Sequence, residues 1–240
     1  MVENQQAIRR YLELDIQNPL PIHDIPSMDL ITWHCRGAGN KKFKKTLRKL
    51  VHIQKPALVV LMEPKVEFKA MGMYFNCMGF TASTQVDPIG RSGGIWMIWN
   101  PNVVNVRVVE ACTQPITAII SRQDFQDWVL SAVYASPNPN KRDELWEQLT
   151  TIAQSMDKPW LVAGDFNDFS SPNEKRSLQG SNTQSINQDL RRSSKFNDRL
   201  NICKLIDLGC ASPQLTWSNN RKGWASTMVQ LDRALCNTEW

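Results

Sequence analysis

The order of hydrophobic and polar positions predicts a chain built mostly of strands, with a few helices between them. Apolar or alternating runs bounded by Gly, Pro, Asn or charged residues are typical of strands. Such runs cover Leu30–Trp33, Ala57–Met62, Phe80–Val86, Gly94–Trp99, Val103–Glu110, Ile116–Ser121, Asp127–Tyr134, Trp160–Ala163, Leu215–Ser218 and Val229–Leu235. Five of them follow one another between residues 80 and 134, as antiparallel strands do.

Two segments repeat their apolar residues at the spacing of a helix. Lys41–Gln54 is predicted as an amphipathic helix with Asn40 as its N-cap, and Lys141–Met156 as a second one. Phe196–Leu208 is predicted to be helical in part. Residues 168–195 are rich in Ser, Asn and Gln, have little hydrophobic period, and are predicted to form a long loop.

Consecutive strands followed by helix–strand units predict an α/β fold of two packed, mainly antiparallel sheets flanked by helices. Residues 1–27 combine mixed charges with three prolines and no sustained period, so we expect a poorly ordered leader there. Residues 28–240 are then expected to form one domain.

Composition narrows the function classes only moderately. The 42% of hydrophobic residues is typical of a globular protein, and no apolar run approaches the roughly 18 residues of a membrane span, so no membrane partner is expected. The formal charge of +5 permits a polyanionic partner without requiring one. Six scattered cysteines without a C-x-x-C pair favour free thiols over zinc or a disulfide framework.

The candidate chemistry begins at Gly164-Asp165-Phe166-Asn167, directly after an apolar strand. Gly164 allows a tight turn, and Asp165 and Asn167 leave extended backbone on the same side. A carboxylate and a carboxamide delivered together suit a hard cation such as Mg²⁺ and a reacting phosphate. A surface turn is the alternative, since Gly, Asp and Asn are common turn residues.

Other strand ends carry further polar groups, which are predicted to meet at one rim. His34 to Gly37, Glu63 to Lys65, Tyr134, and Asp232-Arg233 each lie at the end or start of a predicted strand. For three of these groups a plainer alternative stands: a solvated Glu63, a core ring for Tyr134, and a surface ion pair for Asp232-Arg233. The basic residues between 41 and 49 are either a solvated helix face or a nucleic-acid grip.

Taken in order, these motifs resemble the endonuclease/exonuclease/phosphatase superfamily, specifically the endonuclease domain of plant LINE-type (non-LTR) retrotransposons. The resemblance spans roughly residues 28 to 240. It rests on Ile31-Thr32-Trp33-His34-Cys35-Arg36-Gly37, Leu61-Met62-Glu63-Pro64-Lys65, Ser92-Gly93-Gly94-Ile95-Trp96, Val133-Tyr134-Ala135-Ser136, Arg142, Leu145-Trp146, Gly164-Asp165-Phe166-Asn167, Glu174-Lys175, Leu205-Ile206-Asp207-Leu208-Gly209, Thr216-Trp217-Ser218-Asn219-Asn220 and Gln230-Leu231-Asp232-Arg233-Ala234-Leu235.

The resemblance implies a four-layer α/β sandwich that cleaves phosphodiesters of DNA with Mg²⁺, Mn²⁺ being possible, at an intracellular, nuclear site. It implies metal ligands at Glu63 and His34, and substrate-binding residues at Arg36, Lys65 and Asn219. The implied catalytic residues are Asp165, which orients or deprotonates water; Asn167, which holds a phosphate oxygen or that water; Tyr134, which contacts the phosphate or leaving oxygen; and Asp232, which orients a catalytic histidine.

Two departures from the pattern lower the expected activity. His34 stands where the family has an asparagine, and imidazole nitrogen favours softer metals than Mg²⁺. A late Ser-Asp-His run is absent, since the histidines are His23, His34 and His52, so we expect a truncated fragment or degenerate copy with impaired or no activity. The alternatives are an inactive remnant that binds nucleic acid weakly and another phosphoesterase of the superfamily.

Overall fold

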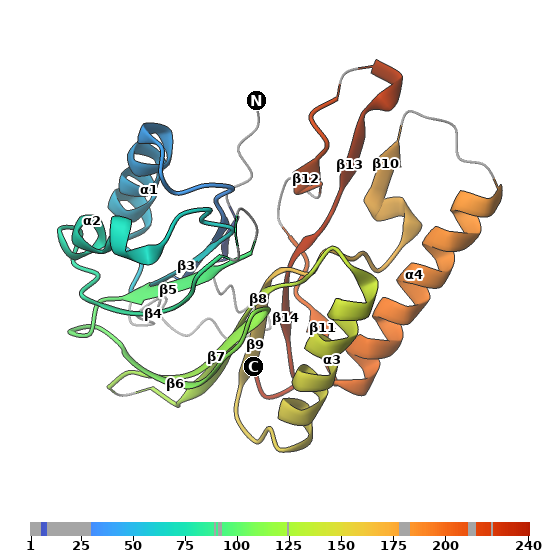
Figure 1. Ribbon diagram of the computed structural model, residues 1–240. Helices are drawn as coiled ribbons and strands as arrows, with labels where there is room; N and C mark the ends of the chain where they lie inside the picture. Colours follow the sequence, from blue (N-terminus) through green and yellow to red (C-terminus); the bar gives the residue numbers. More distant parts are fainter. Residues whose placement is uncertain are drawn as a thin grey trace, which may run out of the picture.

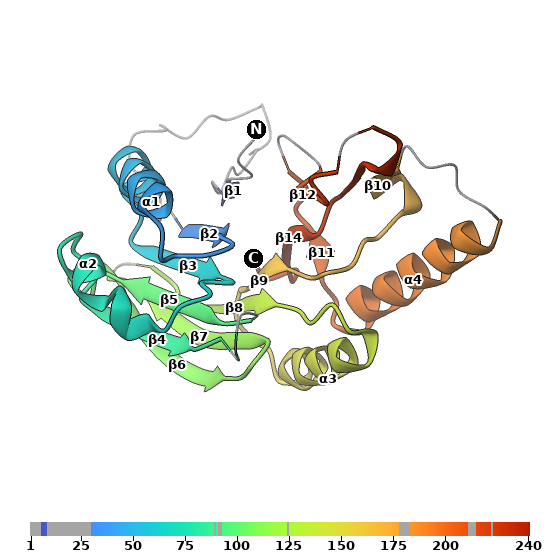
Figure 2. The same ribbon diagram turned by 45° about the horizontal axis from the view of Figure 1, so that its top comes forward.

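Two large sheets pack against each other, with helices on both outer faces, in a computed structural model of the chain (Figures 1 and 2). This arrangement confirms the predicted α/β class of two sheets flanked by helices. The structure describes residues 6–8, 30–88, 90, 93–123, 125–177, 183–210, 215–221 and 223–240. Most of the expected leader therefore lies outside the described residues.

The first sheet has the order β1-β2-β3-β5-β4. Only β2 and β3 run parallel, joined by the crossover helix α1, and the other pairs are antiparallel. Its strands are β1 (Gln6–Ile8), β2 (Leu30–His34), β3 (Leu58–Met62), β4 (Ala82–Val86) and β5 (Ile95–Trp99), and its helices are α1 (Lys41–Gln54), η2 (Phe68–Ala70) and α2 (Gly72–Asn76).

The second sheet has the order β11-β14-β9-β8-β7-β6 and repeats the same plan. Its parallel pair is β8 and β9, joined by α3. Its strands are β6 (Asn105–Ala111), β7 (Pro115–Ser121), β8 (Trp128–Tyr134), β9 (Trp160–Asp165), β11 (Ile206–Asp207) and β14 (Asp232–Cys236), and its helices are α3 (Pro139–Gln154) and α4 (Thr183–Ile202).

A small third sheet of order β10-β13-β12 stands at one end of the sandwich (Figure 1). Its strands are β10 (Lys175–Ser177), β12 (Trp217–Ser218) and β13 (Thr227–Val229), with the short turns η3 (Pro172–Glu174) and η4 (Gly223–Ala225) beside them.

The main hydrophobic core lies between the two large sheets. It joins side chains of β3 and β5, such as Val60 and Met97, to side chains of β8 and β9, such as Leu130 and Leu161. Separate clusters cover the outer faces under α1 and α2 on one side and under α3 and α4 on the other. Because β3, β5 and β9 are buried on both faces, their sequences are nearly continuous apolar runs.

Local capping fixes the ends of the two crossover helices. Asn40 Oδ1 accepts a hydrogen bond from the backbone N–H of Phe43 at 2.7 Å, which confirms Asn40 as the N-cap of α1. Lys55 ends α1 in the left-handed conformation, directly before Pro56. Asn138 caps α3 by accepting from the backbone N–H of Asn140 at 3.0 Å, and Pro139 occupies the first turn.

The predicted long loop over residues 168–195 is wrong in its second half. The helix α4 begins at Thr183 and runs to Ile202. Its buried residues are Ser193, Phe196 and Leu200, whereas Ile186 and Leu190 in the first half are exposed. The hydrophobic period was too weak to see because only the second half packs on the sheet.

The predicted single strand Val229–Leu235 is also wrong, since it consists of two strands in different sheets. β13 ends at Val229 in the small sheet, and β14 begins at Asp232 in the large one. Gln230 and Leu231 carry the chain from one sheet to the other. Sequence periodicity cannot register such a change of sheet, because the backbone remains extended.

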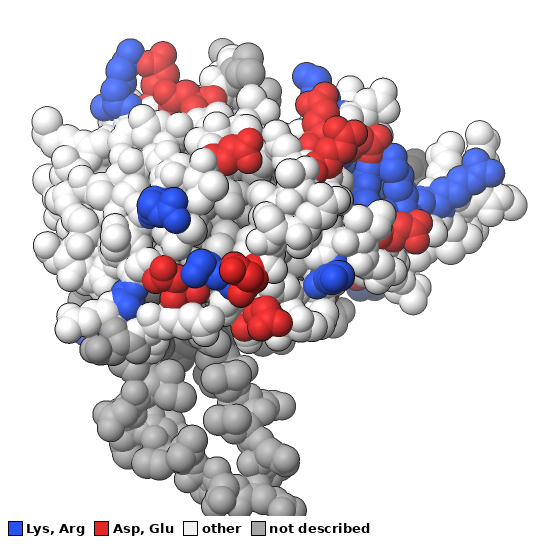
Figure 3. Space-filling view, turned by 90° about the horizontal axis from the view of Figure 1, so that it is seen from below, with Lys and Arg blue, Asp and Glu red and all other residues white. Residues whose placement is uncertain are grey.

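The face of the molecule seen from below shows Lys and Arg mixed with Asp and Glu, separated by wide uncharged areas (Figure 3). A polyanion is attracted by a field of one sign, so this face offers it little. No helix within the described ranges is long and apolar enough to cross a lipid bilayer.

Candidate active site

The strand ends that carry the predicted site residues meet where the two sheets face each other. His34 and Met62 are register partners at the ends of β2 and β3, and Tyr134 and Asp165 are register partners at the ends of β8 and β9. Asp232 begins β14 directly opposite Asp165. Both parallel pairs thus end at the same edge, which is the position that the strand-end argument predicts.

His34 joins the two sheets at this edge. Its Nε2 lies 2.8 Å from Glu63 Oε2, and its Nδ1 lies 3.1 Å from Asp165 Oδ2. Its ring packs edge-on against Tyr134, with ring centroids 5.4 Å apart. Lys65 Nζ lies 3.2 Å from the other oxygen of Glu63. The imidazole therefore occupies the space between the two carboxylates.

Burial and close charges shift the pKa values of this cluster. Burial of the imidazole lowers its pKa, but the hydrogen bonds to Asp165 and Glu63 prevail and raise the pKa of His34 to about 9. Burial, together with the charge of Asp165, raises the pKa of Asp232 to about 6. Burial and the nearby carboxylates of Glu63 and Asp165 raise the pKa of Tyr134 above its ordinary value. At neutral pH His34 is thus a cation and Tyr134 a neutral hydroxyl.

Glu63 is held in its charged form by the same contacts. Burial acts to raise its pKa, but the hydrogen bond and the charge of His34, with a further contribution from Lys65, bring the pKa of Glu63 below its usual range. Glu63 is half-buried and bonded on both oxygens, so the alternative of a freely solvated residue is wrong.

Gly164 serves a different purpose from the tight turn that the sequence suggested. β9 continues through Gly164 to Asp165, and a Cβ added at Gly164 would lie 1.9 Å from the carbonyl oxygen of Val133. The backbone φ of Gly164 is +148°. Glycine is required because β8 and β9 approach closely here, and this contact sets the position of Asp165.

The prediction that Asp165 and Asn167 leave extended backbone on the same side is wrong. Asn167 has a φ of +47°, and its backbone N–H donates to Asp165 Oδ1 at 2.8 Å, which is a turn closed by the aspartate side chain. The Asn167 side-chain amide donates to the carbonyl of Ala135 at 2.7 Å. Asn167 therefore connects the ends of β9 and β8, and the turn and the candidate site are the same segment.

Left-handed backbone conformations gather at this edge of the sandwich. Glu63, Lys65 and Arg36 have φ values of +54°, +61° and +52°, in addition to Asn167. Such conformations are unfavourable for residues with a side chain and persist where the surrounding structure imposes them, which is frequent at functional sites.

The other predicted residues lie at the rim or further away. Arg36 is exposed. Its positive charge acts to lower the pKa values of Tyr134 and Asp232, against the burial and the carboxylates that raise them, so Arg36 lies near both residues. Asn219 lies in the β12–β13 hairpin, where its Oδ1 accepts from two backbone N–H groups and its amide donates to the carbonyl of residue 225. The Asn219 side chain thus holds the hairpin together through bonds that all lie within the hairpin.

Asp232 and Arg233 do not form the surface ion pair considered as an alternative. Arg233 is buried and pairs with Glu174 and with Asp207, the latter at 2.5 Å. Asp232, next along the strand, points to the other face and lies beside Asp165 and His34. Alternation along β14 thus separates a structural arginine from a site carboxylate.

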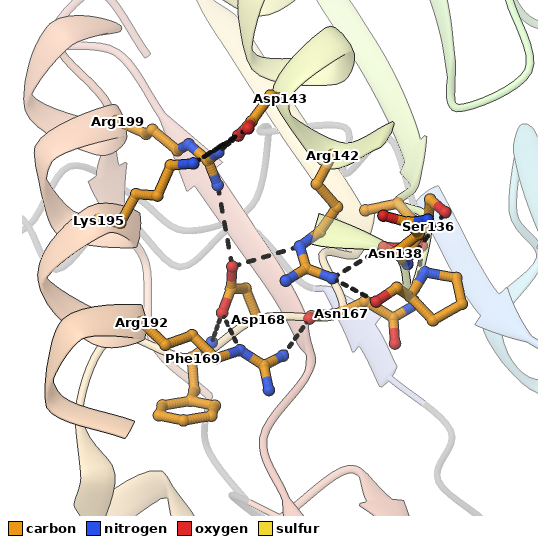
Figure 4. Close-up of polar contacts among 12 residues, drawn as sticks. Ser136, Asn138, Arg142, Asp143, Asn167, Asp168, Phe169, Arg192, Lys195 and Arg199 are labelled. Atoms are coloured by element: carbon orange, nitrogen blue, oxygen red, sulfur yellow. Dashed lines mark hydrogen bonds and ion pairs between the residues drawn. The ribbon is translucent and has the colours of Figure 1, made fainter. Parts of the chain in front are cut away.

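Sequence reasoning missed a charged cluster that supports the site (Figure 4). Asp168 is 2% exposed, and its Oδ1 accepts from Arg192 Nε at 2.6 Å while Arg142 Nε lies 3.4 Å from its Oδ2. Arg142 also donates to the carbonyls of residues 136 and 137, and Arg192 donates to the carbonyl of Asn167. These bonds fasten the loop after β9 to the loop after β8. The available signals were the position of Asp168 directly after the motif and the presence of Arg142 among the residues of the resemblance.

The donor atoms at the site fit some cations better than others. His34, Asp165 and Asp232 each offer a ligand atom within 4.8 Å of the others. Mg²⁺ prefers a shell of oxygen ligands and water, whereas the imidazole of His34 stands between Glu63 and Asp165. The residues therefore do not fit Mg²⁺ between those two carboxylates, and they fit a cation that accepts nitrogen.

Solved structures with the same fold include nucleic-acid enzymes. The endonuclease domain of TRAS1, a telomere-specific non-LTR retrotransposon, aligns with a TM-score of 0.61 and 14% identity over 88% of this chain and 85% of that one. An AP endonuclease from Leishmania major aligns with a TM-score of 0.65 and 15% identity over 88% and 79%. A 3′ phosphatase from Neisseria, bound to product DNA hairpin, gives 0.63 and 14% over 88% and 87%.

These likenesses define the class of the fold, that of nuclease and phosphatase sandwiches. At the level of sequence, residues 31–240 match the Endonuclease/Exonuclease/phosphatase family, and the chain belongs to that family. The comparison with curated proteins found no match.

Proposed function

We propose that this chain is a DNA-nicking phosphodiesterase domain of retrotransposon origin whose activity with Mg²⁺ is weak or absent. The observation that carries the proposal is the convergence of Tyr134, Asp165 and Asp232 with Glu63 and His34 at one edge. Its family membership and its likeness to the TRAS1 endonuclease domain support the same reaction class. DNA is the proposed partner.

Each residue has a chemical role in this proposal. Asp165 is the carboxylate that orients the attacking water and takes its proton. Tyr134, whose raised pKa keeps its hydroxyl protonated even above neutral pH, donates a hydrogen bond to a phosphate or leaving oxygen. Asn167 fixes the loop beside that water, and the exposed cations Arg36 and Lys65 bind phosphate at the rim.

A phosphate at this edge meets a cluster of carboxylates, and a divalent cation would offset that repulsion and the charge that builds on phosphorus. Glu63, Asp165 and Asp232 are the oxygen ligands in reach. The resemblance implies Mg²⁺ or Mn²⁺, but an oxygen-only shell requires His34 to leave both carboxylates. Weak activity with Mg²⁺ follows from that contact.

An inactive remnant that binds nucleic acid is the second candidate. The position of the His34 ring between Glu63 and Asp165 favours it. The exposed cations of α1, which carries no acidic residue, would supply the attraction to phosphate. A third candidate is another phosphoesterase of the family, since one of the solved structures is a 3′ phosphatase.

Plasmid nicking tests the proposal. Supercoiled plasmid incubated with the chain and Mg²⁺ is expected to show slow nicking, and Asp165→Ala is expected to remove what there is. His52→Ala, an exposed change on α1, is the matched control and should leave the rate unchanged. Robust nicking that Asp165→Ala abolishes would refute the impaired activity. Binding of DNA without nicking under any cation would favour the remnant.

A further inference from the structure

The arrangement around His34 resembles that of a nitrogen-bound metal more than that of a magnesium site. Its two ring nitrogens face different groups: Nε2 faces Glu63 at 2.8 Å and Nδ1 faces Asp165 at 3.1 Å. Asp232 offers a third ligand atom within 4.8 Å of those of His34 and Asp165. One nitrogen and two carboxylates thus converge from β2, β9 and β14.

We propose that His34 Nδ1, Asp165 and Asp232 form a binding site for a divalent cation that accepts nitrogen ligands, of the class of Zn²⁺ and Co²⁺. Glu63 would then hold the imidazole from outside, through Nε2–H. This cation site deepens the proposed function by naming the cation. Only the use of the ion in catalysis rests on the proposed function.

The donor set selects the cation. Zn²⁺ and Co²⁺ accept imidazole nitrogen together with carboxylate oxygen, and a catalytic site of this kind has three protein ligands and one open position. Mg²⁺ prefers six oxygen ligands and gives up its waters reluctantly. The three residues of this cluster match the first description.

Glu63 supplies the partner that such a site needs behind its histidine. A histidine that binds a metal through one nitrogen commonly donates its other N–H to a carboxylate, which fixes the tautomer and the orientation of the ring. The 2.8 Å contact between His34 Nε2 and Glu63 Oε2 has this form. Lys65 in turn lies 3.2 Å from the other Glu63 oxygen. When the metal binds, it takes the place of the proton on Nδ1, which is released to solvent.

The backbone brings the three proposed ligands near each other. Asp165 and Asp232 are direct register partners of adjacent antiparallel strands. The close approach of β8 to β9 at Gly164 positions Asp165. His34, at the end of β2, is held by its register partner Met62 on β3. A cation therefore needs no rearrangement of the sheets to reach all three side chains.

Cobalt absorption tests the site without any cleavage assay. The full chain, treated with chelator and then titrated with Co²⁺, is expected to show visible d–d absorption that Zn²⁺ abolishes and that millimolar Mg²⁺ leaves in place. Absence of the band, or displacement of Co²⁺ by Mg²⁺ as readily as by Zn²⁺, would overturn the proposal. Loss of nicking alone would leave the band unchanged, so the two proposals fail separately.

Variants assign the ligands. Glu63→Gln should keep the band and weaken Co²⁺ binding roughly 10- to 100-fold, as for an outer carboxylate. His34→Asn should weaken Co²⁺ binding further, lose the band and gain affinity for Mg²⁺. Asp232→Asn should also lose the band. If the band persists in both the His34→Asn and the Asp232→Asn proteins, the assignment of the ligands is refuted.

Two controls exclude other ligands. Cys35 follows His34 and donates to the Met62 carbonyl, so Cys35→Ser tests whether a thiol binds the cobalt. His52 is exposed on α1, and His52→Asn tests nonspecific imidazole binding. Both variants should retain the affinity and spectrum of the unchanged chain. Loss of the band in either one would place the cobalt elsewhere and refute the proposal.

Discussion

Replacement of Gly164 by alanine should destabilise the protein more than replacement of a glycine that is constrained only by its backbone conformation. The new Cβ would lie 1.9 Å from the Val133 carbonyl oxygen and 2.8 Å from its carbon, which is backbone and cannot rotate away. Met62 Sδ, at 3.1 Å, closes the other side. β8 and β9 must separate to admit the methyl group.

The expected loss is the sum of two effects. The backbone conformation at φ +148° costs about 1–3 kcal/mol for a residue with a side chain. Forcing a methyl group into closely packed strands costs about 1–3 kcal/mol more. We therefore expect a loss of about 2–6 kcal/mol in the free energy of unfolding. In urea this loss lowers the unfolding midpoint by about 0.7 M or more, for a slope of about 1–3 kcal/mol per molar.

Gly209→Ala is the matched control. Gly209 also has a positive φ, of +69°, but no atom lies within 4 Å of its added Cβ. Only the backbone effect applies there, about 1–2 kcal/mol. Urea unfolding followed by circular dichroism compares the two. If Gly164→Ala costs no more than Gly209→Ala, the close approach of β8 and β9 is not the reason for glycine.

Two further predictions concern charges in and near the site. Asp168→Asn should lower the free energy of unfolding by about 3–5 kcal/mol, because Arg142 stays buried without its counter-charge. As a control, Lys195→Ala removes an exposed ion pair and should cost less than about 1 kcal/mol. Equal effects of the two variants in thermal melts would contradict this reasoning. Because the pKa of His34 is raised from 6.5 to about 9, its stabilisation of the metal-free protein is complete below about pH 6.5 and is lost as the pH rises through 9, by up to about 3 kcal/mol. His34→Asn should flatten the stability profile between those pH values, and an unchanged slope would show that His34 is not held as a cation.

Sequence reasoning succeeded where burial is expressed in local pattern. β3, β5 and β9 are buried on both faces, so continuous apolar runs revealed them, and the bounds of α1 were predicted as the structure has them. It failed at α4, where the apolar residues of the first half, Ile186 and Leu190, are exposed and the polar residues around them resemble a loop.

The site shows the same division. Strand ends indicated that His34, Glu63, Tyr134, Asp165 and Asp232 would meet, and they do. Their roles in catalysis stay predictions. The buried charges around Asp168 escaped notice because its partners lie 24 and 26 residues away, on α4 and α3.

The sequence by itself determined the family, the two-sheet fold and the edge at which the chemistry gathers, because each depends on local pattern and on the order of motifs. Tertiary structure decided how the site is filled. Only the packing of the first sheet on the second brings the His34 ring between Glu63 and Asp165, where both ring nitrogens meet carboxylates. Only the contact of β8 with β9 shows why residue 164 is glycine. Distances between strands of different sheets have no local signature, so the substitution at position 34 acquires its meaning in three dimensions.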